Sequence, residues 1–229
     1  MQAVKYQILI GISILLVACL VLIPVFISEP KKVEGWLQLH PIVLEKIEYK
    51  YGPAARQRFV DWQKLMAEGK SMAEQDKLRE VNYFFNRNIL FANDIVLWLK
   101  DDYWATPLEL LCKGAGDCED FAIAKYFTLL EVGVDESKLR ITYVKALNLN
   151  LPHMVLTYYE NPQADPLVLD NLTSNISSAT ERTDLLPVYS FNGTSLWINK
   201  LKGSGRRVGD GERLDVWADL NRRMLEMVL

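Results

Sequence analysis

Cys118 lies in a local sequence that suits a nucleophilic thiol. It follows the turn-forming stretch 114–117 (Gly-Ala-Gly-Asp) and precedes an apolar stretch at 121–130 that is typical of a buried helix. The positive end of a helix dipole lowers the pKa of a thiol in the first turn, and the thiolate is the reactive form of cysteine. Asp117 is predicted as the N-cap and Asp120 as the acid of a capping-box-like arrangement, which places Cys118 in the first helical turn.

The histidine content limits the choice of a catalytic base to His40 and His153. His40 precedes a proline near the start of the folded region, where a surface turn is the simpler interpretation. His153 begins a strand-like stretch at 154–159, and a second such stretch, 167–169, runs into Asp170. The two stretches predict a hairpin whose cross-strand neighbours bring the imidazole and the carboxylate together. Such a carboxylate can hold one ring N–H and leave the other nitrogen facing a thiol.

Each member of the predicted triad, Cys118, His153 and Asp170, also has a purely structural interpretation. The cysteine could be an inert buried residue, the histidine a surface residue after a proline, and the aspartate the start of an Asx turn. Their joint occurrence favours catalysis, because the cysteine follows a glycine-bearing turn at a helix start and the other two share one hairpin.

Acidic residues surround the predicted nucleophile. Carboxylates beside a thiol disfavour its thiolate, so the negative charge of Asp117, Glu119 and Asp120 needs an offset. Helix capping accounts for Asp117 and Asp120 but leaves Glu119 unexplained. Three carboxylates in a glycine-bearing turn also suit Ca²⁺, with backbone carbonyls, water or another acid completing the shell. We therefore predict Ca²⁺ as a cofactor, bound by these three acids.

The rest of the chain predicts an α+β domain that positions these residues. Apolar residues recur at helical spacing in the first half, and alternating β-branched residues mark strands in the second. The expected elements are helices at 53–67, 72–89 and 212–227 and from 118 onward, strands at 139–146, 154–159, 167–169 and 197–201, an irregular or short-helical stretch at 95–111, and a glycine- and arginine-rich loop at 203–211.

The N-terminus predicts membrane targeting. Residues 7–28 contain no charged side chain and are almost wholly aliphatic, which is typical of an export signal or a membrane anchor. A stretch of this length matches a bilayer core and favours an uncleaved anchor over a cleaved signal. Lipidation at Cys19 is a third interpretation. We therefore expect an anchor or signal segment at 1–29, a linker at 30–35 and one folded domain at 36–229.

The charge balance excludes one class of partner. The 229 residues include 26 basic and 29 acidic side chains, with no long basic run, so nucleic acid is not an expected partner. Cys112 is interpreted as a small buried hydrophobe, and we do not expect it to form a disulfide with Cys118.

Several of these residues together resemble a known family. Residues 116–120 (Gly-Asp-Cys-Glu-Asp), His153, the pair 169–170 and the stretch 104–109 (Trp-Ala-Thr-Pro-Leu-Glu) are similar to the bacterial transglutaminase-like cysteine proteases. The resemblance runs from Trp36 to the C-terminus. It implies a papain-like or transglutaminase-like core, with N-terminal helices packed on an antiparallel sheet and the nucleophile at a helix N-terminus.

The resemblance also implies a biological role. Members of the family are periplasmic enzymes that cleave a large repeat adhesin near its N-terminus, which releases it from the cell surface and disperses biofilm. They rely on calcium bound by acids around the nucleophile, which correspond to Asp117, Glu119 and Asp120. An inner-membrane receptor that senses cyclic di-GMP restrains them through its periplasmic domain. The N-terminal segment would add tethering to the inner membrane.

Two alternatives remain open at this point. The same Cys-His-Asp set forms an acyl-enzyme from glutamine as readily as from a peptide bond, so transglutaminase or deamidase chemistry is the alternative among enzymes. A catalytically silent module that binds a membrane receptor is the alternative outside enzymes.

Overall fold

The computed structural model describes residues 39–198, 206–211 and 215–226. Within these ranges no helix has the length and apolar character needed to cross a membrane. The predicted anchor or signal segment, its Cys19 and the linker lie outside the described residues, so those assignments stay predictions.

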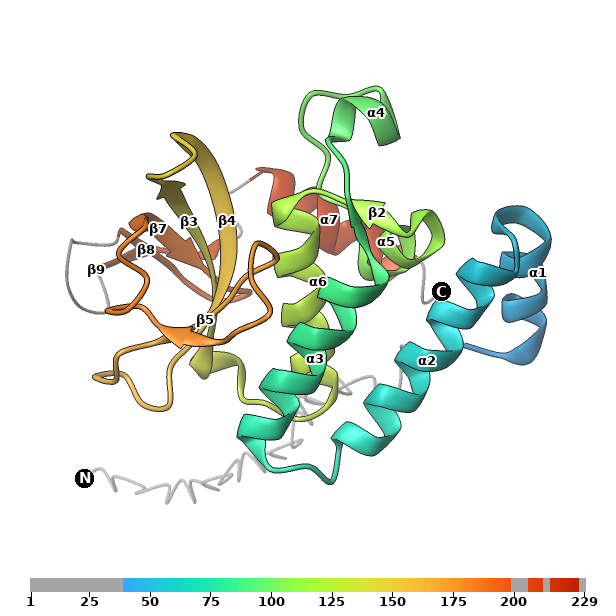
Figure 1. The fold of residues 1–229 in the computed structure, drawn as a ribbon, viewed down its shortest axis with the longest axis horizontal. Helices are drawn as coiled ribbons and strands as arrows, with labels where there is room; N and C mark the ends of the chain where they lie inside the picture. The colour runs from blue at the N-terminus through green and yellow to red at the C-terminus, as the bar shows by residue number, and fades with distance from the viewer. Residues whose placement is uncertain (1–38, 199–205, 212–214, 227–229) are drawn as a thin grey trace, which may run out of the picture. The chain divides into compact units, whose positions relative to one another are not determined.

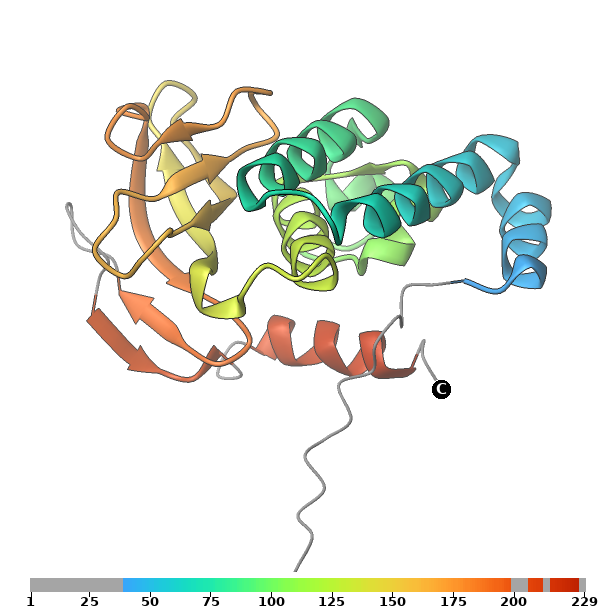
Figure 2. The ribbon, with the colours of Figure 1, turned by 90° about the horizontal axis from the view of Figure 1, so that it is seen from below.

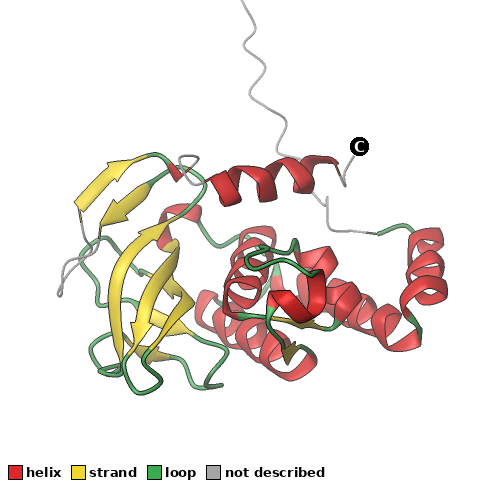
Figure 3. Cartoon of the chain, turned by 90° about the horizontal axis from the view of Figure 1, so that it is seen from above, coloured by secondary structure: helices red, strands yellow, loops and turns green. Residues whose placement is uncertain are grey.

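Helices gather on one side of the domain and strands on the other (Figures 1 and 3). The helices are α1 (Pro41–Tyr51), α2 (Pro53–Gly69), α3 (Glu74–Asn88), α4 (Asp94–Trp98), α5 (Pro107–Lys113), α6 (Cys118–Glu131), the 3₁₀ turn η1 (Glu136–Lys138) and α7 (Asp215–Glu226).

The main sheet has seven strands, and every neighbouring pair is antiparallel. In spatial order its strands are β6 (Ser177–Ser178), β5 (Leu167–Leu169), β4 (Leu151–Tyr158), β3 (Leu139–Ala146), β7 (Leu185–Phe191), β8 (Leu196–Ile198) and β9 (Arg206–Gly209). A separate short parallel pair joins β1 (Leu90–Phe91) to β2 (Ala115–Gly116).

Helix α6 is enclosed by the elements around it. Most of its residues are buried, including Phe121, Ile123 and Leu129, as expected for a helix that is apolar nearly all round. It lies between α3 and strand β4 and contacts both (Figure 1). Packing on several sides fixes the position of the helix start, where Cys118 lies.

The predicted fold class is confirmed, with differences in individual elements. Helices α2, α3 and α6 and strands β3, β4 and β5 occur where the sequence predicts them. His153 is the third residue of its strand rather than the residue that begins it, because β4 starts at Leu151. The expected loop at 203–211 is wrong for 206–209, which form β9. This strand pairs with β8 through its backbone and has an exposed or half-exposed surface, so it lacks the apolar alternation of a core strand.

Helix α1 was not predicted. The helix begins at the His40–Pro41 dipeptide, for which a surface turn was the simpler interpretation. His40 is the N-cap, and its Nδ1 accepts the backbone N–H of Ile42 at 3.3 Å. Pro41 is the first helical residue. Proline suits this position because its fixed φ matches a helix and its missing N–H would have no intrahelical partner. His40 therefore has a structural role at a helix start.

Helix α7 (Figure 2) buries Trp217, Leu220 and Met224 against the domain. The largest of these side chains is Trp217, which is 1% exposed. Its ring contacts four aromatic rings from other parts of the chain: Trp104, Tyr126, Phe127 and Phe191. Aromatic side chains of this kind bury large apolar surfaces and add favourable ring geometry.

We predict that Trp217→Ala lowers the free energy of unfolding by about 3–5 kcal/mol, the usual cost of emptying such a site. Urea denaturation followed by circular dichroism measures this. The neighbouring Val216, which is 36% exposed, supplies the control: Val216→Ala should change stability by less than about 1 kcal/mol. Equal effects of the two substitutions would contradict a large contribution of Trp217 to stability.

Candidate active site

The turn before α6 places Cys118 at the first helical position. Asp117 is the N-cap, and its backbone N–H donates to Asp120 Oδ2 at 3.4 Å, which is one half of the predicted capping box. The turn packs tightly at Gly116, where an added Cβ would lie 2.5 Å from Leu110 Cδ1 and 2.6 Å from Asp120 Oδ2. A larger residue at this position would therefore require the side chain of Leu110 or Asp120, or the turn itself, to move.

His153 and Asp170 form a buried hydrogen-bonded pair. His153 Nε2 and Asp170 Oδ1 are 2.8 Å apart, and the side chains are 7% and 0% exposed. Asp170 follows the last paired residue of β5, since Leu169 lies opposite Leu156 in the hairpin. Burial alone would raise the pKa of Asp170, but hydrogen bonds from His153, from the backbone N–H of Leu172 and from an arginine lower it to about 2. The carboxylate is therefore ionised at neutral pH.

Strand β4 brings the imidazole of His153 to the helix that begins at Cys118. The backbone N–H of Met154 hydrogen-bonds the Cys118 sulfur, which favours the thiolate, and α6 packs directly on β4. His153 immediately precedes Met154, so the strand segment that carries the imidazole lies against the thiol. The structure thus brings the three predicted triad residues into one region, although their catalytic roles stay predictions.

The acids around Cys118 oppose its ionisation, as the sequence predicts. The thiol donates a hydrogen bond to Glu119 Oε2 at 3.0 Å. Burial, followed by the charge and hydrogen bond of Glu119 and the charge of Asp117, raises the pKa of the Cys118 thiol far above its ordinary value. Without a compensating positive charge, the thiol is strongly favoured over the nucleophilic thiolate.

Three carboxylates meet beside the thiol and form a candidate metal site. Asp94, Asp117 and Glu119 each offer an oxygen, and these oxygens lie within 4.8 Å of one another. Burial and the neighbouring acids raise the pKa of Asp117 to about 9, and burial chiefly raises that of Asp94 to about 6. The Oδ1 atoms of Asp94 and Asp117 are buried and have no hydrogen-bond partner among the described residues. Unpartnered, closely spaced carboxylate oxygens suit a hard cation such as Ca²⁺.

Asp120, also predicted as a calcium ligand, lies outside this group of three. Its Oδ1 accepts the backbone N–H of Ala105 at 2.7 Å, its Oδ2 accepts that of Asp117, and the residue is fully buried. These bonds join the segment before α5 to the start of α6. Its role as a ligand stays a prediction, while the geometry gives it a structural role at the turn.

Asp94 was missed by the sequence reasoning. It is the first residue of the short helix α4 and accepts the backbone N–H of Tyr103. The only local signal is an acid at the start of an apolar stretch, 95–99. Nothing in the sequence places that stretch beside residue 117.

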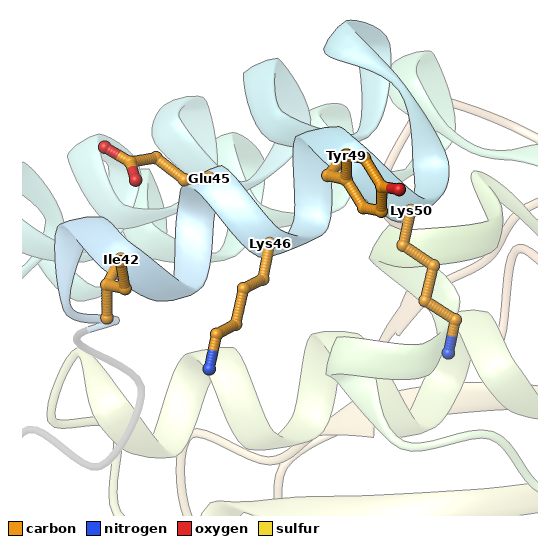
Figure 4. A pocket seen from close by; sticks show the side chains of 5 residues that line it. All are labelled: Ile42, Glu45, Lys46, Tyr49 and Lys50. Carbon is orange, nitrogen blue, oxygen red and sulfur yellow. The ribbon is translucent and has the colours of Figure 1, made fainter.

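A surface hollow lies away from these residues. It is lined by one face of α1, where Figure 4 shows Ile42, Glu45, Lys46, Tyr49 and Lys50. Neither the predicted triad nor the acidic group contributes to it.

Cys112, on α5, is a free thiol like Cys118, and burial raises its pKa to about 11.

The family model of the bacterial transglutaminase-like cysteine proteinases matches residues 57–198, a range that contains all the residues of this site. The chain belongs to this family. It is therefore a cysteine protease with a transglutaminase-like fold, as the sequence predicted.

Solved structures agree with this family assignment. An EGTA-treated LapG from Legionella pneumophila is 44% identical with a TM-score of 0.69, and the match covers 79% of this chain and 97% of that protein. A calcium-bound LapG from the same organism is 43% identical with a TM-score of 0.69, covering 80% and 98%. A comparison with curated proteins found no match. A relative of this transglutaminase-like cysteine proteinase thus binds calcium.

Proposed function

We propose that this chain is a calcium-dependent periplasmic endopeptidase that cleaves the N-terminal region of a large surface adhesin. The observation that carries the proposal is the buried His153–Asp170 pair on the strand that contacts the Cys118 thiol, within a cysteine proteinase family. Cleavage would release the adhesin from the cell surface and promote biofilm dispersal.

In the proposed mechanism Cys118 is the nucleophile, His153 the base and Asp170 the orienting group. The imidazole takes the thiol proton, and the sulfur attacks the scissile carbonyl carbon to form a tetrahedral intermediate. Collapse breaks the C–N bond, the imidazolium gives its proton to the leaving amine, and a thioester remains. Water, deprotonated by the same imidazole, then attacks the thioester carbonyl and releases the new carboxylate and the thiol.

Asp170 fixes the imidazole for both proton transfers. Because its carboxylate is ionised and bonded to Nε2, that nitrogen carries the proton and Nδ1 is the one left to exchange protons with the thiol. The ionised carboxylate also stabilises the imidazolium that forms when His153 takes the proton of the Cys118 thiol.

Asp94, Asp117 and Glu119 are the residues that would hold Ca²⁺. Bound there, Ca²⁺ supplies positive charge that offsets the field of these acids at the thiol. The carboxylates come from α4 (Asp94), from the N-cap of α6 (Asp117) and from its first turn (Glu119), so holding them together also fixes the start of α6.

The location and the partners of the proposal come from the family resemblance. The uncharged, aliphatic stretch at 7–28 supports export and tethering to the inner membrane. We include in the proposal an inner-membrane receptor for cyclic di-GMP, whose periplasmic domain would sequester the protease and so control adhesin release.

Incubation with a dialanine-containing fragment of an adhesin N-terminus tests the proposed activity. We expect two new termini, identified by mass spectrometry, in the presence of calcium and none with Cys118→Ala. Ammonia release without chain cleavage would contradict proteolysis and indicate deamidase or transglutaminase chemistry. Biological activity that survives Cys118→Ala would instead indicate a silent receptor-binding module.

A further inference from the structure

We propose that Arg182 is a positioning residue for catalysis, which holds the carboxylate of Asp170 in place from the side opposite His153 and supplies a permanent positive charge there. The proposal rests on the proposed catalytic roles of Cys118, His153 and Asp170 and extends them. Arg182 lies in the connection between β6 and β7, far along the chain from the nucleophile.

The two oxygens of Asp170 are bonded to different side chains. Oδ1 bonds His153 Nε2 at 2.8 Å, and Oδ2 accepts from Arg182 Nη2 at 2.8 Å. A carboxylate bonded at both oxygens cannot rotate, so the oxygen that faces the imidazole stays in place. The Asp170 and Arg182 side chains are 0% and 11% exposed, so water screens their attraction weakly.

Arg182 is itself fixed by a third residue. Its Nε and Nη2 donate to the two oxygens of Asp184 at 2.9 and 2.8 Å, a two-bond geometry that holds the guanidinium plane. Asp184 is 33% exposed and lies nearer the surface. The contacts form a continuous chain from Asp184 through Arg182 and Asp170 to His153.

The other groups around Asp170 do not replace this cation. Lys125, from α6, is fully buried, and burial lowers its pKa to about 7, so its charge is only partly present at neutral pH. Asn86, from α3, is neutral and donates to the backbone carbonyl of Asp170 at 2.7 Å. Arg182 stays charged at every pH at which a protein is folded. It is the permanent positive charge on this carboxylate among the described residues.

Loss of Arg182 should therefore lower the reactivity of Cys118 by an amount that depends on pH. Burial raises the pKa of Asp170, and the arginine is one of the groups that oppose this effect. With Arg182→Gln, Asp170 takes up its proton at a higher pH than in the wild type. A protonated Asp170 no longer stabilises the imidazolium, so the reactivity of Cys118 should fall first on the acid side.

The test is the pH profile of Cys118 alkylation by iodoacetamide, measured in full-length protein with calcium present. We expect Arg182→Gln to move the acid limb upward by about one pH unit, equivalent to about a ten-fold slower reaction on that limb, with a change under about three-fold at pH 8. Arg79→Gln is the matched control, since Arg79 pairs with Asp76 on the surface of α3 and should leave the profile unchanged. No substrate is needed, so failure of adhesin cleavage would not affect the result.

Proton NMR gives a second readout of the same change. The chain has only two histidines, so the ring signal of exposed His40 serves as an internal reference for that of His153. In Arg182→Gln we expect the His153 signal to respond to Asp170 protonation at a higher pH than in the wild type, while His40 is unchanged.

Two results would overturn the proposal. One is an unchanged pH profile in folded Arg182→Gln, and the other is a loss of reactivity that is equal at all pH values, which would indicate a structural role alone. Arg182→Lys keeps the charge but loses the two-bond geometry, so its acid limb should lie between those of the wild type and the glutamine variant. Should Arg182→Gln fail to fold, an unshifted limb in Arg182→Lys overturns the proposal.

Discussion

Cys118→Ala should reduce cleavage of the adhesin fragment by about 10⁴-fold or more, to the level of the uncatalysed background. Alanine removes the sulfur that forms the thioester, and no other described residue at the site can replace it. The measurement is kcat/KM from the appearance of the new N-terminus. The Cys118 side chain is partly buried and alanine is smaller, so the variant should keep the fold, with circular dichroism as the check.

Cys112→Ala is the matched control for this prediction. Cys112 is also a free thiol, but it lies on α5 outside the acidic group, and burial raises its pKa to about 11. We expect activity within about two-fold of the wild type, because the raised pKa keeps this thiol protonated and unreactive at neutral pH. Retained cleavage in Cys118→Ala, or a comparable loss in Cys112→Ala, would contradict the assignment of the nucleophile.

Removal of calcium should have the second largest effect, lowering kcat/KM by about 100-fold or more, with recovery when calcium but not magnesium is restored. The reason is electrostatic: burial, Glu119 and Asp117 together raise the pKa of the Cys118 thiol, and bound calcium would offset the contribution of the two acids. Stability should respond as well, since a ligand at 100 times its Kd adds about 2.7 kcal/mol. Thermal unfolding with EGTA and with calcium measures this contribution. Full activity in excess chelator would disprove the calcium requirement.

Substitutions at two aspartates, Asp94 and Asp120, distinguish a role in calcium binding from a role in structural support. Asp94→Asn should weaken calcium binding by about ten-fold or more in isothermal titration calorimetry, because it removes a charged ligand and keeps the volume. Asp120→Asn should chiefly lower stability, because both of its oxygens accept backbone N–H groups. Asp61→Asn, at an exposed position on α2, is the control. Wild-type calcium affinity in Asp94→Asn would exclude Asp94 as a ligand.

The local patterns in the sequence were sufficient for the two pieces that carry the predicted triad. A glycine-bearing turn before an apolar stretch predicted that Cys118 begins a helix, and the structure has α6 starting at that residue. Two strand-like stretches predicted that His153 and Asp170 meet on one hairpin, and the side chains are hydrogen-bonded. Both predictions depend on residues that are near in the chain, where turn geometry and strand register limit the outcome.

Other elements lacked such a signal. Helix α1 depends on a proline and a histidine cap more than on apolar spacing, and strand β9 depends on backbone pairing at the edge of the sheet. Strand β7 pairs with β3, from which a long stretch of chain separates it. Pairings of this kind are selected by the whole sheet, so local periodicity could not reveal them.

The sequence by itself thus determined the turn before Cys118, the hairpin that carries His153 and Asp170, and the presence of clustered acids around Cys118. The tertiary structure decided which groups surround them. It brings Asp94 close to Asp117 and Glu119. It also makes Asp120 an acceptor of a backbone N–H and pairs Arg182 with Asp170. The physical reason is that ion pairs and metal sites depend on distances in space of a few ångströms. These distances are set by how α4, α6 and the connection before β7 pack, and residue spacing along the chain does not record that packing.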